Sequence, residues 1–309
     1  MKNVVFLNPR TCGIYKDGGA RFKTDTKTGL RTDEIDNELI DHVTSFLGGR
    51  SPVGAATIQF DQVFENQVLA PTYYDERYNE AIKRLLASES LEGITIRELI
   101  SEGHIRVRGG HGSPGNDQRF GHIPYVKVSD IRGLRINTNP TNLVSESVAA
   151  RFWRGDNSGL EPWDLITPNR ASSNIGEFAI LLPGEERVVL TKEVFVIRVV
   201  QSNLVDPFYL LWAFSLKAVR DQWRRITLMQ TNREDCGQRY REIIVPKPKS
   251  NTWAKSTSAS FRDYFQTIAN ARTAFIEQVR TSEYEHVANV ISSTPIDAEE
   301  DSDAGESGA

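Results

Sequence analysis

The sequence predicts a mixed α+β fold that is followed by one long C-terminal helix. Short β-rich runs broken by turn residues recur between residues 122 and 200. Apolar residues return at helical spacing over residues 257–291, which would make a helix of about 50 Å at 1.5 Å per residue. Apolar residues make up 39% of the 309 residues and charged residues 25%, enough for one large or two modest domains.

The first 93 residues are predicted to form short elements, of which residues 1–50 are too little to be a domain. The run Val4–Leu7 predicts a strand, and the Gly-, Lys- and Asp-rich stretch after it predicts turns or a hairpin. Helical spacing of apolar residues predicts helices over Asp33–Phe46 and Asp75–Ser88. Residues 1–50 therefore look like the end of something larger, and residues 51–93 like a helical linker.

Residues 94–250 are predicted to form the mixed-sheet domain. The glycine-rich stretch Arg108–Gly115 contains neither GxxxxGK[ST] nor GxGxxG, so a flexible surface loop is preferred to a nucleotide cradle. Its other predicted elements are an amphipathic turn at 94–100, strands at 122–131, Trp163–Thr167, Glu177–Leu182, Val188–Val200 and EIIVPKP, and helices at Ser145–Phe152 and Asp206–Trp223.

The C-terminal stretch carries the most regular apolar stripe of the chain, and we predict a long helix over residues 256–292. Such a helix either folds back on its own domain or forms a coiled-coil-like arm that pairs with a second copy or another subunit, and its length favours the arm. The tail of residues 293–309 is acidic and poor in apolar residues, so it is expected to be disordered.

The net charge of −4 hides two basic islands. Six acidic residues lie in the tail from Asp297, which leaves residues 1–296 with 37 basic and 35 acidic side chains. Residues 104–135 hold six Lys or Arg against two Asp, and residues 217–241 hold seven against three acidic residues. Such islands indicate a surface that faces phosphates, although solvated faces of like charge are also common.

No catalytic or metal-binding motif is found in the sequence. HExxH, GxSxG, Cys-x-x-Cys and Walker sequences do not occur, the five His residues are scattered, and Cys12 and Cys236 are far apart. The NPPY-type motif and glycine-rich cofactor loop of an S-adenosylmethionine-dependent amino-methyltransferase are missing too. The start is too polar for a signal peptide and no apolar run reaches about 20 residues, so a soluble protein is expected. The two widely spaced cysteines make a reducing cytoplasm the expected location.

Four segments, in order, resemble the target recognition domain of type I restriction-modification specificity subunits: IPYVKVSDIRG, EPWDLITPNRASSNIGEFAIL, DPFYLLWAFSLKAV and ITLMQTNREDCGQRYREIIVPKPK. The family pattern is an "IPyikisDI" strand, a "GDilfsr…GkvAil" hairpin, a "pyYLyyyl" helix and a strand that ends in "iPlP". This chain has Pro162-Trp163 where the family often has a Gly, and LITPNRASSN in place of "LFSRSG". The resemblance covers roughly residues 1–290. Its motifs are individually loose, and their order along the chain is the stronger evidence for it.

Two segments before these resemble methyltransferase-associated sequences. VLAPTYYDERYNEAIKRLL is similar to the "rlDpeyYdp" lead-in that precedes such domains where they are fused to methyltransferases. Residues 8–39 resemble the segment that follows the catalytic core of adenine N6 DNA methyltransferases. The resemblance implies a non-catalytic specificity subunit that binds double-stranded DNA. It also implies a methyltransferase partner that holds S-adenosylmethionine, with a restriction/translocase subunit and a second copy as further partners left open.

Two polar loops are the candidates for reading bases. Arg pairs bidentately with guanine, and Asn or Gln with adenine, in the major groove, whereas basic side chains that contact phosphates fix the register. Ordinary turn chemistry stays an alternative for each loop. The base-reading candidates are Asn169, Arg170, Ser172, Ser173 and Asn174 in the first loop, and Gln230, Thr231, Asn232 and Arg233 in the second. The phosphate candidates are Arg106, Arg108, Lys127, Arg132, Arg135, Arg224, Arg225, Arg239 and Arg241.

Two other functions are compatible with the sequence. The chain could be a non-catalytic scaffold whose basic islands bind RNA or an acidic protein. It could also be a nuclease or methyltransferase whose motifs depart from the known patterns. The recognition domain remains the preferred interpretation.

Overall fold

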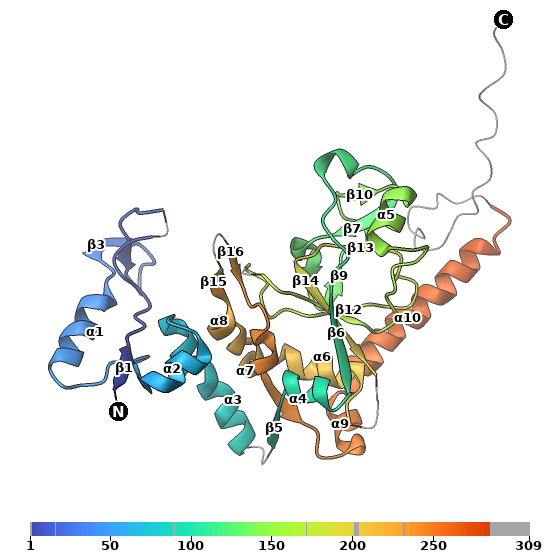
Figure 1. Cartoon of the computed structure of the whole chain (residues 1–309). Helices are drawn as coiled ribbons and strands as arrows, with labels where there is room; N and C mark the ends of the chain where they lie inside the picture. Colours follow the sequence, from blue (N-terminus) through green and yellow to red (C-terminus); the bar gives the residue numbers. More distant parts are fainter. Residues whose placement is uncertain are drawn as a thin grey trace, which may run out of the picture. The chain divides into compact units, whose positions relative to one another are not determined.

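The computed structural model describes residues 2–15, 17–88, 91–170, 172–200, 204–230 and 233–284 (Figure 1). The chain forms two compact units: Met1–Ser90 with Lys217–Ile244, and Leu91–Leu216 with the chain from Val245 onward. We refer to them as unit 1 and unit 2. The fold is mixed α and β with small sheets and a long C-terminal helix, as predicted. The division into units cuts across the predicted range 94–250, because residues 217–244 belong to unit 1.

Unit 1 begins with two small antiparallel strand pairs. Strand β1 (Asn3–Phe6) pairs with β4 (Ala56–Gln59), and β2 (Phe22–Thr24) pairs with β3 (Arg31–Ile35). The predicted helix Asp33–Phe46 is wrong at its start, because residues 33–35 belong to β3. Helix α1 (Glu38–Leu47) begins after Asn37, whose side chain caps it by accepting a hydrogen bond from the Leu39 N–H.

The core of unit 1 is built from segments far apart in the sequence. Helix α3 (Arg77–Ser88), which confirms the helix expected over residues 75–88, packs against α7 (Lys217–Arg220) and α8 (Gln222–Ile226). Phe6 and Tyr74 stack with their ring centroids 4.3 Å apart, and Val63 is buried with them. The other elements of the unit are α2 (Phe60–Asn66), the 3-10 helices η1 (Pro71–Tyr74) and η4 (Arg239–Glu242), and the hairpin β15 (Leu228–Gln230) and β16 (Arg233–Asp235).

The single helix predicted over Asp206–Trp223 is three short helices. Helix α6 (Pro207–Ser215) ends at Leu216, which has extended backbone with ψ 130°, and α7 and α8 follow in unit 1. Asp206 caps α6 by accepting hydrogen bonds from the N–H groups of residues 208 and 209. No Gly or Pro marks the break, so the apolar periodicity of the sequence predicted one continuous helix.

Two sheets form the centre of unit 2. The first is antiparallel, in the order β12 (Ala179–Ile180), β11 (Leu165–Pro168), β14 (Val194–Val199), β6 (Ile105–Gly109). The second has the order β10 (Leu143–Val144), β7 (Ile123–Val126), β13 (Val189–Leu190), with β13 parallel to β7. The predicted strand Val188–Val200 is therefore two strands, because the chain passes from one sheet to the other after Leu190.

Short elements complete unit 2. Helix α5 (Glu146–Trp153) confirms the helix predicted there and contacts β13. The other elements are β5 (Glu92–Thr95), which pairs with β17 (Ile244–Lys247), α4 (Ile96–Ser101), the 3-10 helices η2 (Asn116–Gln118) and η3 (Val128–Asp130), and the two-residue strands β8 (Ile131–Arg132) and β9 (Arg135–Ile136).

The glycine-rich stretch Arg108–Gly115 is anchored, so the prediction of a flexible loop is wrong. Its first two residues belong to β6. The Gly110 N–H donates to the Val194 carbonyl, and the N–H groups of His111 and Gly112 donate to the Leu190 carbonyl. A Cβ on Gly110 would lie 1.9 Å from the Thr191 carbonyl oxygen, so this position has room only for glycine.

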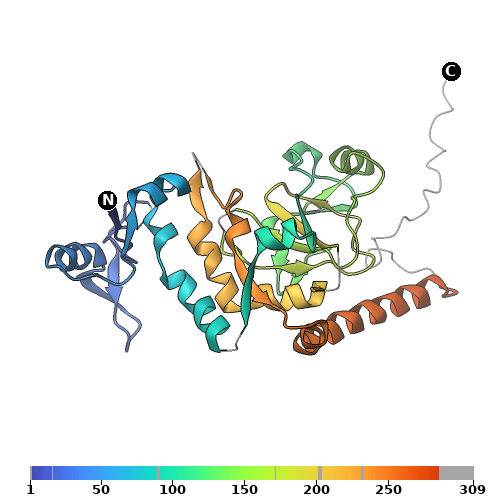
Figure 2. The same ribbon diagram turned by 60° about the horizontal axis from the view of Figure 1, so that its bottom comes forward.

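The first part of the C-terminal helix, as far as Arg272, lies against its own unit, and residues 273–280 are mostly exposed. Helix α9 (Asn251–Thr257) leads into α10 (Ala259–Arg280), a helix of 22 residues (Figure 2). Helix α10 contacts α6. Phe265 is buried, and Arg262 forms an ion pair with Asp206 at 2.7 Å. This part of the helix therefore follows the folded-back alternative. Residues 285–292 of the predicted arm and the acidic tail 293–309 lie outside the described residues, and pairing with a second copy stays a prediction.

Candidate nucleic-acid interface

The first predicted recognition loop joins β11 to β12. The Asn169 N–H donates to the Glu193 carbonyl at 3.0 Å, and its side-chain amide donates to the Lys192 carbonyl at 3.3 Å. The Arg170 guanidinium forms an ion pair with Glu193 at 2.5 Å, and 41% of its side chain is exposed. These two candidates therefore lie at the surface, fastened to the turn between β13 and β14. Ala171 lies outside the described residues.

Asn174, at the other end of this loop, is enclosed. Its side chain is 2% exposed, and its amide donates to the carbonyls of Val128 and Ile131, both at 2.9 Å. The Ser173 hydroxyl donates to the Asn174 amide oxygen at 2.9 Å, and the Ser172 hydroxyl accepts from the Asn174 N–H. Asn174 thus uses its hydrogen-bonding groups to hold the segment before β8, and it could meet a base only if the loop opened.

The second predicted recognition loop belongs to unit 1. Gln230 and Arg233 pair across the hairpin of β15 and β16. Thr231 and Asn232, together with the side chains of Gln230 and Arg233, lie outside the described residues. Base reading by this loop stays a prediction.

Two of the phosphate candidates in unit 1 share one internal carboxylate partner. The Glu242 carboxylate accepts hydrogen bonds from the Tyr73 hydroxyl at 2.9 Å, from Arg225 at 3.2 Å and from Arg239 at 2.8 Å. Both guanidinium groups also lie 4.8 Å from the Tyr73 ring centroid. Burial, and then the Glu242 charge, raise the pKa of Tyr73. The other two candidates of this unit are Arg224, which is exposed, and Arg241, whose Nε donates to the Tyr240 hydroxyl.

The phosphate candidates of unit 2 differ in how far their charge is offset. Arg135 forms an ion pair at 2.5 Å with Glu185, a 1% exposed carboxylate that also pairs with Arg272 of α10 at 3.0 Å. The charge of Arg135 is therefore offset inside its unit, and Glu185 is the residue that links to α10. Arg132 is 57% exposed and lies 3.8 Å from a Glu177 oxygen. Lys127 is half-buried.

The remaining candidates, Arg106 and Arg108, line a cavity of about 600 Å³ in unit 2. In the register of β6 and β14, Arg106 lies opposite Arg198 and Arg108 opposite Val196, so these side chains share one face of the sheet. The opposite wall is the loop of residues 154–159 that follows α5. Sequence reasoning missed two arginines that line this cavity, Arg154 and Arg198.

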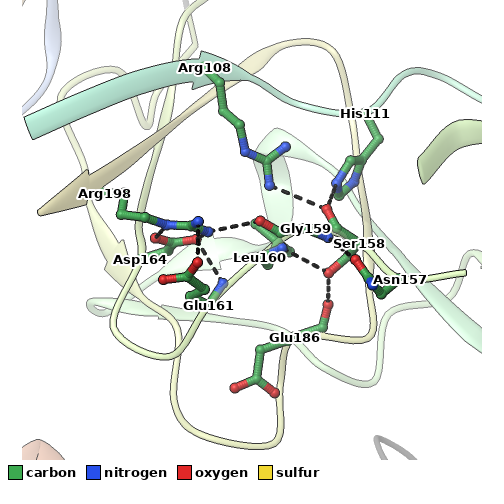
Figure 3. Close-up of polar contacts among 10 residues, drawn as sticks. All are labelled: Arg108, His111, Asn157, Ser158, Gly159, Leu160, Glu161, Asp164, Glu186 and Arg198. Atoms are coloured by element: carbon green, nitrogen blue, oxygen red, sulfur yellow. Dashed lines mark hydrogen bonds and ion pairs between the residues drawn. The ribbon is translucent and has the colours of Figure 1, made fainter. Parts of the chain in front are cut away.

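Arg198 is neutralised within the protein. Its guanidinium bonds the Asp164 carboxylate at 2.6 and 2.8 Å, the Glu161 carboxylate at 2.6 Å and the Gly159 carbonyl at 2.8 Å (Figure 3). Hydrogen bonding to Asp164 is the main cause of the raised pKa of Arg198. Arg198 therefore builds the wall of the cavity and adds little free charge to it.

Arg108 and Arg106 form no ion pair of their own with a described residue. Arg108 donates to the Ser158 carbonyl at 3.3 Å, toward which Figure 3 shows it pointing. Burial lowers the pKa of Arg108; the Asp164 charge acts in the opposite direction, and the neighbouring Arg198 charge lowers the pKa further. Within the described part of the chain no carboxylate forms an ion pair with Arg108 or with the exposed Arg106. The cavity therefore attracts anions.

His111 holds the wall of the cavity in place. Its Nδ1 accepts from the Leu190 N–H at 2.9 Å, so Nε2 carries the proton and donates to the Ser158 carbonyl at 2.8 Å. Burial lowers the pKa of His111 to about 4, so the ring is neutral near pH 7. The Ser158 hydroxyl in turn donates to the Glu186 carbonyl. The sequence alone indicated no role for His111, because only the fold brings it next to Leu190 and Ser158.

The described ranges contain no group of three or more His, Cys, Asp or Glu side chains that could hold a metal ion. Every helix in those ranges is too short or too polar to cross a membrane.

No protein-family model and no curated protein sequence matches this chain. Among solved structures, the HsdS subunit from Thermoanaerobacter tengcongensis is similar at 12% identity and a TM-score of 0.37, over 84% of this chain and 61% of that one. The S subunit of a type I restriction-modification system from M. genitalium is similar at 14% identity and a TM-score of 0.36, over 70% and 55%. The type IIG restriction endonuclease BpuSI is similar at 10% identity and a TM-score of 0.43, over 67% and 30%. The matched parts thus cover between 30% and 61% of these proteins.

Proposed function

We propose that this chain is a sequence-specific DNA-recognition subunit, or a fragment of one, of a restriction-modification system. The observation that carries the proposal is the cavity lined by Arg106 and Arg108, neither of which forms an ion pair with a described carboxylate. These guanidinium groups, together with the partly exposed Asn169 and Arg170, provide the two kinds of contact that duplex recognition needs, to phosphates and to base edges.

Arg170 is the strongest candidate for contacting a base. Its ion pair with Glu193 is substantially exposed, and such pairs contribute about 1 kcal/mol or less to stability. Exchanging Glu193 for the O6 and N7 atoms of a guanine would therefore cost little, and it would gain a bidentate contact. Asn169 beside it gives up one long hydrogen bond of 3.3 Å if its amide turns to a base.

A backbone feature supports the resemblance to specificity subunits. The family pattern often has Gly where this chain has Pro162-Trp163. Trp163 has φ 71°, in the left-handed region that favours glycine. Its ring lies 5.0 Å from that of Phe208, a contact that helps to hold this conformation. The turn before β11 is thus compatible with the family's glycine despite the different residue.

A partner chain would supply catalysis in this proposal. Helix α1 buries none of its residues, and Ile40 and Leu47 are 63% and 78% exposed. Exposed apolar side chains on one short helix are typical of a surface that another polypeptide covers. The proposed occupant is an adenine N6 methyltransferase that binds S-adenosylmethionine and flips the target adenine. A restriction/translocase subunit, and a second copy that pairs through residues 256–292, extend the proposal.

Selection from a random duplex library tests recognition. We expect the wild-type chain to enrich one sequence, and Arg170→Ala to lower its preference about tenfold. Arg224→Ala should weaken binding to all sequences alike and flatten its salt dependence. Arg97→Ala, an exposed arginine on α4, serves as the control and should change neither. Equal binding to every duplex would overturn the proposal, and tighter binding to RNA or to an acidic protein would favour the scaffold function.

The mass of the chain in solution tests its partnerships. We expect a complex with the methyltransferase subunit, and Leu47→Asp should weaken it because it places a charge on the apolar face of α1. Glu76→Gln, an exposed change on another part of unit 1, is the control. A chain that stays monomeric both alone and with the methyltransferase would exclude pairing through the long helix.

A further inference from the structure

The arginine cavity interrupts a face of the sheet that is otherwise aliphatic. Along β14 the residues on this face are Val194, Val196 and Arg198, of which the two valines belong to the hydrophobic core. On the neighbouring edge strand β6 the same face carries Arg106 and Arg108. A half-buried guanidinium without a carboxylate partner weakens the folded state unless a ligand balances its charge.

Arg154 adds a third charge at a cost in backbone energy. It ends helix α5 with φ 62° and ψ 36°, a left-handed conformation in which glycine is the usual residue. A residue with a side chain costs about 1 kcal/mol more than glycine there. The chain keeps an arginine at this position, although Gly155 follows directly, and its side chain lines the cavity.

The charges that line the cavity sum to a clear excess. Its lining includes four arginines and one carboxylate, the exposed Asp156. Arg198 is paired with two further carboxylates, Asp164 and Glu161, so four arginines and three carboxylates leave a net charge of +1. His111 contributes no charge near pH 7. The sign of this net charge favours an anion such as a phosphate group.

We propose that this cavity binds the phosphate of a nucleotide, with Arg106, Arg108 and Arg154 as its ligands. Its volume of about 600 Å³ falls within the usual range for small-molecule sites and exceeds the needs of a bare phosphate ion, so it has room for the attached sugar. The inference rests on the proposed function in taking nucleic acid as the ligand. The same chemistry would be offered by a free mononucleotide or by one nucleotide of a DNA strand.

Binding of defined probes to the full chain tests this site. The probes are deoxyadenosine 5′-monophosphate, deoxyadenosine, a single-stranded 12-mer and the same 12-mer as a duplex, each measured by titration calorimetry. We expect Arg108→Gln and Arg154→Gly to weaken the binding of the phosphate-bearing probes about tenfold or more, since each variant loses a charge-assisted hydrogen bond. Asp156→Asn should strengthen the binding of these probes several-fold, and Arg97→Gln should leave it unchanged.

The outcomes distinguish a free nucleotide from a nucleotide of a DNA strand, and they also show whether the inference is wrong. Loss of the mononucleotide in Arg108→Gln supports a site for free nucleotides, and loss of a 12-mer alone supports a site for a DNA strand. Measurable binding of deoxyadenosine that equals the binding of its monophosphate would overturn the inference, as would wild-type binding of all probes by both cavity variants. Arg154→Gly relieves the left-handed strain, so it tests the site in a protein that folds. Sequence preference that survives in Arg108→Gln would leave the proposed function intact.

Discussion

Replacement of Asn174 by alanine measures whether this residue reads bases or holds the fold. The substitution removes two hydrogen bonds of 2.9 Å and leaves the Val128 and Ile131 carbonyls without their donor. Each such bond contributes about 1 kcal/mol net, and an unsatisfied buried carbonyl adds its own desolvation cost. We therefore expect the free energy of unfolding to fall by about 2–4 kcal/mol. Asn169→Ala, which loses one bond of 3.3 Å at the surface, should cost about 0.5 kcal/mol.

Urea denaturation of the two variants, followed by circular dichroism, supplies the comparison. Because the chain has two compact units, its unfolding need not be two-state, so amide hydrogen exchange should locate the loss. Faster exchange is expected in residues 123–136, which Asn174 holds in place. An Asn174→Ala protein with wild-type stability and reduced sequence preference would refute the structural role and restore Asn174 as a base reader.

Two further predictions concern His111, which lines the cavity, and its neighbour Gly110. The folded-state pKa of His111, about 4, lies below its ordinary value of 6.5, so the unfolded state binds the proton more readily between these values. Stability should therefore fall by up to about 3 kcal/mol as the pH drops from 6.5 to 4, and His111→Gln should flatten this part of the stability–pH curve. Gly110→Ala should lower the unfolding free energy by about 2 kcal/mol or more through its clash with Thr191, whereas Gly109→Ala, with open space around it, should not. Equal melting temperatures for the two glycine variants would contradict the second prediction.

Elements with a local signal could be predicted from the sequence. Helix α3 follows Pro71 and carries an apolar stripe, and α5 begins after Ser145, whose side chain caps it, so both were found. The break at Leu216 has no such signal. Its extended backbone arises where the chain passes from unit 2 to unit 1, which only tertiary structure specifies.

The candidate site was predictable only in part, and for the same reason. Arg106 and Arg108 were chosen for their charge, and the structure places both at the cavity. Arg198 joins them through strand pairing across about 90 residues of sequence, and Arg154 through the loop after α5. Asn174 has the residue type of a base reader, and its burial decides against that role in the closed loop.

The interrupted course of unit 1 has a consequence for its biosynthesis. Residues 217–244 supply α7 and α8, which pack on α3, and they leave the ribosome long after residues 1–90 have been made. During translation the early segment must therefore wait, with Tyr73 and Ile82 still uncovered, while the whole of residues 91–216 is synthesised. A chaperone that binds exposed aromatic and aliphatic side chains would meet the nascent chain in this interval. Truncations for laboratory work should accordingly keep 1–90 and 217–244 in one polypeptide, since neither piece holds a complete core.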